Sequence, residues 1–129
     1  MLRLLNEKES INVVSDQSGS PTCGRDLATG IMMIIDEISS VFRPADGSNL
    51  PLIFNYSNAG VTTWFEFALA IKELSGSTCK VNPISTSAYP TAAKRPLYSV
   101  LDTNKIQDLF HFRIPDWKDS LRECLQLMK

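Results

Sequence analysis

A run of polar residues at positions 16–22, Asp-Gln-Ser-Gly-Ser-Pro-Thr, directly follows a short apolar stretch. The Gln17 side chain offers an amide donor and an acceptor, and Thr22 offers a hydroxyl. A turn after a strand often carries ligand contacts, because the strand holds it while the turn exposes backbone amides. The alternative is an ordinary strand-to-helix turn in which Thr22 caps the helix. From residue types alone, the structural interpretation is the stronger one.

A second run whose residue types could bind a ligand is Lys94-Arg95-Pro96. An arginine guanidinium matches a pair of phosphate or diphosphate oxygens, and the proline that follows stiffens its approach. The alternatives are a solvated surface pair, or an arginine held against a carboxylate such as Asp102. The residue types favour neither interpretation over the other.

A third run, Asn-Ala-Gly-Val-Thr-Thr-Trp at positions 58–64, stands before an apolar repeat typical of a helix. The free amides at the start of a helix can hold an anion. However, Thr63 and Glu66 match a capping box, which would occupy those amides. We therefore favour a structural helix, with Trp64 and Phe67 in the core.

The elements that must position these runs alternate between strand and helix. Residues 1–9 read as the end of a helix whose beginning is missing. Strands are expected at 11–15, 52–56 and 80–85, the last at a sheet edge because of Pro83. Helices are expected at 25–39 and 64–75, around 106–110 and from 115 onward, with loops at 43–51 and 90–96. The predicted fold class is α/β, with a small, partly parallel sheet of about three short strands and flanking helices.

Composition indicates one ordinary globular domain covering residues 1–129. Hydrophobic residues make up 43% and charged residues 21% of the chain, and the formal net charge is -1. A chain of this charge lacks the positive electrostatic field that binds nucleic acid, although one or two hydrogen-bond donors suffice to hold a pyrophosphate. The apolar runs are too short to span a membrane. Three scattered cysteines favour reduced thiols and a cytoplasmic location.

The residues needed for several common chemistries are missing from the sequence. No tyrosine is followed four residues later by a lysine, so the acid–base pair of short-chain dehydrogenases is absent. The glycines are too widely spaced for a dinucleotide loop, and the single histidine, His111, accompanies no nucleophile or metal-ligand motif. We assign no catalytic, cofactor-binding or metal-binding residue in this chain.

Two of these motifs resemble dTDP-4-dehydrorhamnose reductase, an extended short-chain dehydrogenase. The first reads Asp-Gln-x-Gly-x-Pro-Thr at positions 16–22, followed by Asp-Leu-Ala at 26–28. The second reads Pro-Thr-x-x-Lys-Arg-Pro-x-x-Ser-x-Leu-Asp at positions 90–102. The chain departs from the family at Cys23-Gly24, where an aromatic and a small residue are more usual. The resemblance implies that the following residues bind substrate: Gln17, Gly19, Pro21, Thr22, Lys94 and Arg95.

The resemblance further implies that the chain is the carboxyl-terminal, sugar-nucleotide-binding portion of such a reductase, without its amino-terminal Rossmann domain. The whole enzyme would reduce dTDP-4-dehydro-6-deoxy-L-mannose to dTDP-L-rhamnose with NADPH or NADH bound in the missing domain. Magnesium is associated with the family, and a homodimer is left open. We expect this chain alone to bind a dTDP-sugar and to be inactive. The alternatives are a non-catalytic regulatory or binding protein related to the reductase, and a portion of another nucleotide-sugar reductase or epimerase.

Overall fold

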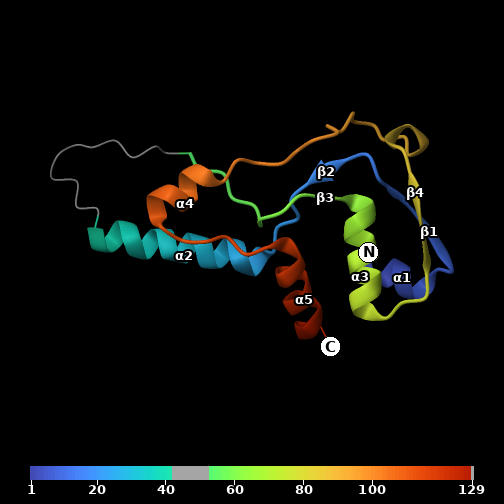
Figure 1. Ribbon diagram of the computed structural model, residues 1–129, viewed down its shortest axis with the longest axis horizontal. Helices are drawn as coiled ribbons and strands as arrows, with labels where there is room; N and C mark the ends of the chain where they lie inside the picture. Colours follow the sequence, from blue (N-terminus) through green and yellow to red (C-terminus); the bar gives the residue numbers. More distant parts are fainter. Residues whose placement is uncertain (42–52, 129) are drawn as a thin grey trace.

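The computed structural model describes residues 1–41 and 53–128. Figure 1 shows α1, α3, β1 and β4 gathered at one end, α2 and α4 at the other, and α5 between them. The predicted helices are all present, and the loop expected at 43–51 lies outside the described residues. In chain order the elements are α1 (Leu2–Glu7), β1 (Ser10–Val14), β2 (Ser18–Gly19), α2 (Gly24–Val41), β3 (Thr62–Thr63), α3 (Trp64–Ser75), β4 (Lys80–Ile84), the 3-10 turn η1 (Thr86–Ala88), α4 (Asn104–Phe110) and α5 (Trp117–Leu127).

Strands β1 and β4 form a parallel pair, with Val14 opposite Ile84 at its carboxyl end. Helix α3 packs on both strands, and the core beneath it holds the buried side chains of Leu5, Ile71 and Cys79. Because α3 leads directly into β4, this arrangement is an α/β unit, as the alternation of elements predicts. Within the described residues β4 pairs only with β1, in agreement with the edge position expected from its proline.

The strand predicted at residues 52–56 is wrong. Residues 53–56 form no strand, and Leu52 lies outside the described residues. Their aromatic side chains instead pack on α4: the rings of Phe54 and Phe110 meet edge to face, with centroids 5.3 Å apart. Aromatic residues suit a strand and a packed extended segment equally well, so composition does not separate the two.

A second sheet, missing from the sequence prediction, joins β2 to β3. The two strands are antiparallel, with Ser18 opposite Thr63 and Gly19 opposite Thr62. Each strand has two residues, too short for any alternation of polar and apolar side chains to be recognised. This pairing brings the polar turn after β1 against the start of α3.

Helix α2 carries more apolar surface than its neighbours cover. Ile34 packs against a second core of Ile106, Phe110 and Ile114, whereas Ile31 and Ile35 are each 48% exposed. Apolar residues recur at helical spacing along α2 in the sequence, but such spacing does not show which neighbour covers them. None of the helices in residues 1–41 and 53–128 is long and apolar enough to cross a membrane.

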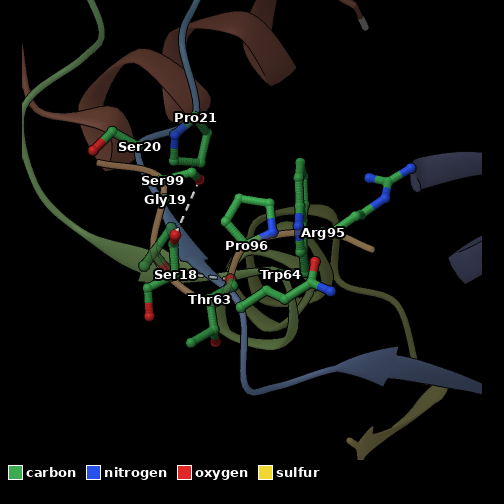
Figure 2. A pocket seen from close by; sticks show the side chains of 11 residues that line it. Ser18, Gly19, Ser20, Pro21, Thr63, Trp64, Arg95, Pro96 and Ser99 are labelled. Carbon is green, nitrogen blue, oxygen red and sulfur yellow. Dashed lines mark hydrogen bonds between the residues drawn. The ribbon is translucent and has the colours of Figure 1, made fainter. Parts of the chain in front are cut away.

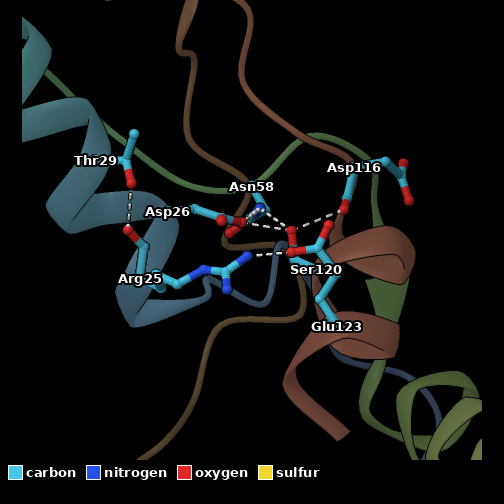
Figure 3. A network of polar contacts seen from close by, with 7 residues as sticks. All are labelled: Arg25, Asp26, Thr29, Asn58, Asp116, Ser120 and Glu123. Carbon is cyan, nitrogen blue, oxygen red and sulfur yellow. Dashed lines mark hydrogen bonds and ion pairs between the residues drawn. The ribbon is translucent and has the colours of Figure 1, made fainter. Parts of the chain in front are cut away.

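A buried polar cluster holds α2, α5 and the segment before β3 together (Figure 3). At its centre the Asn58 side chain is only 1% exposed. Its Oδ1 accepts from the Cys23 amide at 2.7 Å, and its Nδ2 donates to Asp26, Ser120 and the Pro115 carbonyl at 2.6, 2.9 and 3.1 Å. The amide thus satisfies groups from three segments. In this structure Asp26, part of the Asp-Leu-Ala run, has a structural role.

We predict that replacing Gly60 with alanine lowers the free energy of unfolding by about 2 kcal/mol. Gly60 has φ +89°, and an added Cβ would lie 2.8 Å from both Asp116 Oδ2 and Trp117 Cδ1. The control is Gly76→Ala: Gly76 also has a positive φ of 70°, but no atom lies within 4 Å of its added Cβ. That variant should cost about 1 kcal/mol. Urea unfolding measures both, and equal costs would contradict the predicted clash.

Candidate functional site

Three segments meet around one open pocket, which we call the site pocket (Figure 2). It has an open volume of about 370 Å³ and is lined by residues 17–21 and 62–64 together with Arg95, Pro96 and Ser99. The segments that form it follow β1, span β3 and the start of α3, and precede α4. Two of them follow the carboxyl ends of parallel strands, where ligands usually bind in α/β folds.

A second cavity, which we call the strand groove, adjoins the site pocket. The two share Gln17, Trp64 and Arg95, and the groove continues along residues 11–14 to Met1 and Leu4. Both Met1 and Leu4 are exposed, at 41% and 39%. The groove therefore places exposed apolar side chains beside the first strand.

The backbone of Ser18 fastens the Arg95 segment to the pocket. The Ser18 amide donates to the Leu97 carbonyl at 2.8 Å, and the Ser99 amide donates to the Ser18 carbonyl at 2.9 Å. The Ser99 hydroxyl also donates to that carbonyl at 3.1 Å. A Cβ on Gly19 would lie 3.0 Å from Ser99 Oγ, so glycine suits this close approach.

The turn after β1 is also tied to the turn after β4. The Asp16 carboxylate accepts from the Thr86 amide at 2.9 and 3.0 Å and from the Thr86 hydroxyl at 2.6 Å. Gln17 Nε2 donates to Thr86 Oγ1 at 3.0 Å. Hydrogen bonds from the Thr86 hydroxyl, and then from its amide, lower the pKa of the Asp16 carboxyl from its ordinary value. The sequence prediction missed Thr86; its only signal was a Ser-Thr-Ser run directly after a strand.

Trp64 corrects another prediction. The sequence pattern predicts a core position, but the side chain is 47% exposed and lines both cavities. Because helical Cα–Cβ bonds tilt toward the amino terminus, a side chain in the first position reaches past the end of its helix. The indole meets Phe67 edge to face at 6.4 Å, and Phe67 packs against the buried Trp117 at 5.7 Å. The pocket therefore has a supported aromatic wall.

The start of α3 is not arranged to hold an anion. The Thr63 hydroxyl accepts from the Glu66 amide at 3.1 Å, and the Glu66 carboxylate accepts from the Thr63 amide at 2.8 Å. This capping box was predicted and is confirmed. The hydrogen bond from the Thr63 amide lowers the pKa of the Glu66 carboxyl. An ionised carboxylate at this end of the helix would repel an incoming anion.

The other predicted site residues occupy different positions. Arg95 lines both cavities and takes part in no ion pair among the described residues, so the alternative pairing with Asp102 is not formed. Asp102 instead accepts from the Asn104 amide at 2.9 Å, at the start of α4. Pro21 lines the site pocket, whereas Lys94 and Thr22 line neither cavity. The Thr22 hydroxyl donates to the Ser20 carbonyl at 3.3 Å, within the turn.

The described residues contain no group of three or more His, Cys, Asp or Glu side chains placed to hold a metal ion. We therefore assign no magnesium ligands among these residues, and the magnesium that the family resemblance suggested stays a prediction for the whole protein. Instead, the site pocket combines an open guanidinium, an indole, a side-chain amide and hydroxyls. This combination, at the carboxyl ends of parallel strands, defines a domain suited to binding a polar small molecule that carries a negative charge.

Comparison with known proteins identifies the family. Residues 1–129 match the family described as RmlD substrate binding domain, and the chain belongs to that family. It is 37% identical over 126 residues to the spore coat polysaccharide biosynthesis protein SpsK of Bacillus subtilis, covering 98% of this chain and 40% of that protein. It is 36% identical over 129 residues to dTDP-4-dehydrorhamnose reductase of Sinorhizobium fredii, covering 97% of this chain and 42% of that enzyme.

Solved structures agree with the assignment. A dTDP-4-dehydrorhamnose reductase from Clostridium acetobutylicum matches with a TM-score of 0.83 and 34% identity, over 98% of this chain and 41% of that one. The Bacillus anthracis reductase, solved in complex with NADP, matches with a TM-score of 0.82 and 33% identity, over 99% and 41%. The chain thus spans about two-fifths of the length of these relatives.

Proposed function

We propose that this chain is the sugar-nucleotide-binding portion of a dTDP-4-dehydrorhamnose reductase, acting in the synthesis of dTDP-L-rhamnose. The observation that carries the proposal is the position of Arg95. Its guanidinium is open among the described residues and lines both cavities, at the edge of a pocket with an aromatic wall. A guanidinium suits a diphosphate, and an exposed indole suits a planar base or the apolar face of a sugar.

The length of the relatives supports a proposal that this chain and the rest of the whole protein have different roles. Because the chain spans about two-fifths of them, we place NADPH binding and the transfer of hydride and proton in the rest of the whole protein. The described part would contribute by holding and orienting the substrate. All three cysteines are free, which supports a reducing, cytoplasmic setting for the whole protein.

The proposal predicts how the 129-residue protein responds to ligands. We expect dTDP and dTDP-L-rhamnose to raise its thermal unfolding midpoint and to give measurable heats in calorimetric titration, because a ligand that binds only the folded state stabilises it. We expect no response to NADPH and no NADPH-dependent reduction of dTDP-4-dehydro-6-deoxy-L-mannose. Failure of both dTDP ligands to bind would overturn the proposal for this chain, and measurable reduction would overturn the predicted inactivity.

A second candidate is a portion of another nucleotide-sugar reductase or epimerase. The observation in its favour is the similarity to SpsK, whose name connects it to spore coat polysaccharide without specifying rhamnose. Titration of the same protein with UDP- and GDP-sugars beside dTDP-L-rhamnose separates the two candidates. Tighter binding of a UDP- or GDP-sugar would favour the second.

A further inference from the structure

Among the residues of the site pocket, Gln17 has a nearly buried side chain whose hydrogen-bonding groups are only partly satisfied. It is 8% exposed and lines both the site pocket and the strand groove. Among the hydrogen bonds of the described residues, its side chain makes only the one from Nε2 to Thr86 Oγ1, at 3.0 Å. The amide oxygen, Oε1, therefore has no partner within the described part of the protein.

Proton counting determines which way this amide points. An ionised Asp16 carboxylate can only accept, so the Thr86 hydroxyl, 2.6 Å from Asp16 Oδ1, must donate its single proton there. Thr86 Oγ1 then has only lone pairs left for Gln17. The Gln17 atom that faces it must therefore be the NH₂ group, and the amide oxygen must face away from Thr86. The lowered pKa of Asp16 keeps the carboxylate ionised at neutral pH.

The amide oxygen consequently reaches open space. No buried side-chain nitrogen or oxygen in the described residues lacks a hydrogen-bond partner. Since Oε1 has no such partner, it must be accessible, and the open spaces beside Gln17 are the two cavities that it lines. An unpaired acceptor in a cavity discriminates strongly between ligands, because a ligand without a matching donor leaves it desolvated and unsatisfied.

We propose that Gln17 Oε1 accepts a hydrogen bond from a donor group of the bound ligand, and that Asp16 and Thr86 are positioning residues that fix this orientation. The inference rests on the proposed function and deepens it. A diphosphate is an acceptor and suits Arg95, whereas Gln17 requires a donor. A dTDP-sugar offers three kinds: the N3–H of the thymine, the 3′-hydroxyl of the deoxyribose and the hydroxyls of the hexose.

The test is calorimetric titration of the 129-residue protein with dTDP-L-rhamnose and with ligands that each lack one of these three kinds of donor. Gln17→Met, which retains length but removes the acceptor, should weaken dTDP-L-rhamnose binding about five- to tenfold. For the ligand that lacks the relevant donor, the same substitution should change affinity less than about twofold. The ligands are dTDP, which lacks the hexose, and the N3-methyl and 3′-deoxy analogues of dTDP-L-rhamnose.

Two further variants test the positioning roles. Thr86→Val preserves shape but removes the hydroxyl, so the Gln17 amide is free to rotate, and we expect about threefold weaker binding with the same ligand dependence. Thr86→Ser restores the hydroxyl and should bind within about twofold of the wild type. A merely structural role for Thr86 would weaken all ligands alike. Thermal unfolding of each variant confirms that it is folded.

The outcomes separate this inference from the proposed function. If the wild type binds no dTDP ligand, the proposed function fails for this chain and the inference fails with it. If the wild type binds but Gln17→Met weakens every ligand equally, or none, the proposed function stands and the inference is overturned. Loss of the Gln17 effect with one ligand supports the inference and identifies whether base, deoxyribose or hexose supplies the donor.

Discussion

Replacing Arg95 with alanine is expected to weaken binding of dTDP and dTDP-L-rhamnose by about 10- to 100-fold. The guanidinium is the cation that lines both the site pocket and the strand groove, and a charge-assisted hydrogen bond to a phosphate contributes about 1.5–3 kcal/mol. Calorimetric titration of the 129-residue protein measures the loss. Arg95 is exposed and its side chain makes no hydrogen bond or ion pair among the described residues, so the unfolding midpoint without ligand should stay nearly unchanged.

The neighbouring cation provides a matched control. Lys94→Ala removes the same charge one residue earlier, but Lys94 lines neither cavity. If Arg95 acts through its position, this variant should bind within about threefold of the wild type, because an exposed charge outside the pocket contributes little. Equal losses in the two variants would instead indicate a general attraction between a basic segment and a diphosphate. The predicted binding role of Lys94, which stems from the family motif, is tested by the same comparison.

Replacing Asn58 with leucine should produce the largest loss of stability, about 3 kcal/mol in the free energy of unfolding. Leucine has a similar size but cannot accept from Cys23 or donate to Asp26, Ser120 and Pro115. The Cys23 amide would lose its partner, and Asp26, Ser120 and the Pro115 carbonyl would each lose one hydrogen bond, around a site that is 1% exposed. Urea unfolding followed by circular dichroism measures the change, which corresponds to a fall of about 10 °C in the unfolding midpoint.

Asn55→Leu is the control for this prediction. Asn55 is exposed, and its side chain makes a single hydrogen bond, from Nδ2 to the Asp102 carbonyl at 3.3 Å. Its replacement should change the free energy of unfolding by no more than about 0.5 kcal/mol. Similar losses in both variants would mean that the Asn58 cluster contributes no more than a surface contact.

The elements that could be predicted from the sequence depend on local rules. The Thr63–Glu66 capping box and the glycine that ends α3 lie within one helix and its immediate flanks, so spacing alone identifies them. The β-branched composition of β1 and the edge position of the proline-containing β4 are equally local. The strand predicted at 52–56 was wrong because the same composition also suits an extended segment packed against a helix.

The same distinction between local and long-range contacts applies to the residues of the site. The turn after β1 and the Arg95 segment were identified from residue types and a family resemblance, and the structure brings Gln17, Gly19, Pro21 and Arg95 to one pocket. Trp64 was assigned to the core because periodicity registers the face of a helix but not its end. Thr86 was missed because its role depends on Asp16, which lies 70 positions away.

By itself, the sequence determined the α/β class, the helices with the capping box of α3, and the two motifs that could meet a phosphate or a polar ligand. These depend on contacts within a few residues, or on residue types that chemistry restricts. Only the tertiary structure decided which segments share a pocket, that Trp64 forms its wall, that the Gln17 amide oxygen is left free, and that Asn58 joins three segments. Those properties depend on pairing between residues 30 to 70 or more positions apart, as in the contacts of Asn58 and Gln17. Many sequences can satisfy such pairings, so no local pattern specifies them.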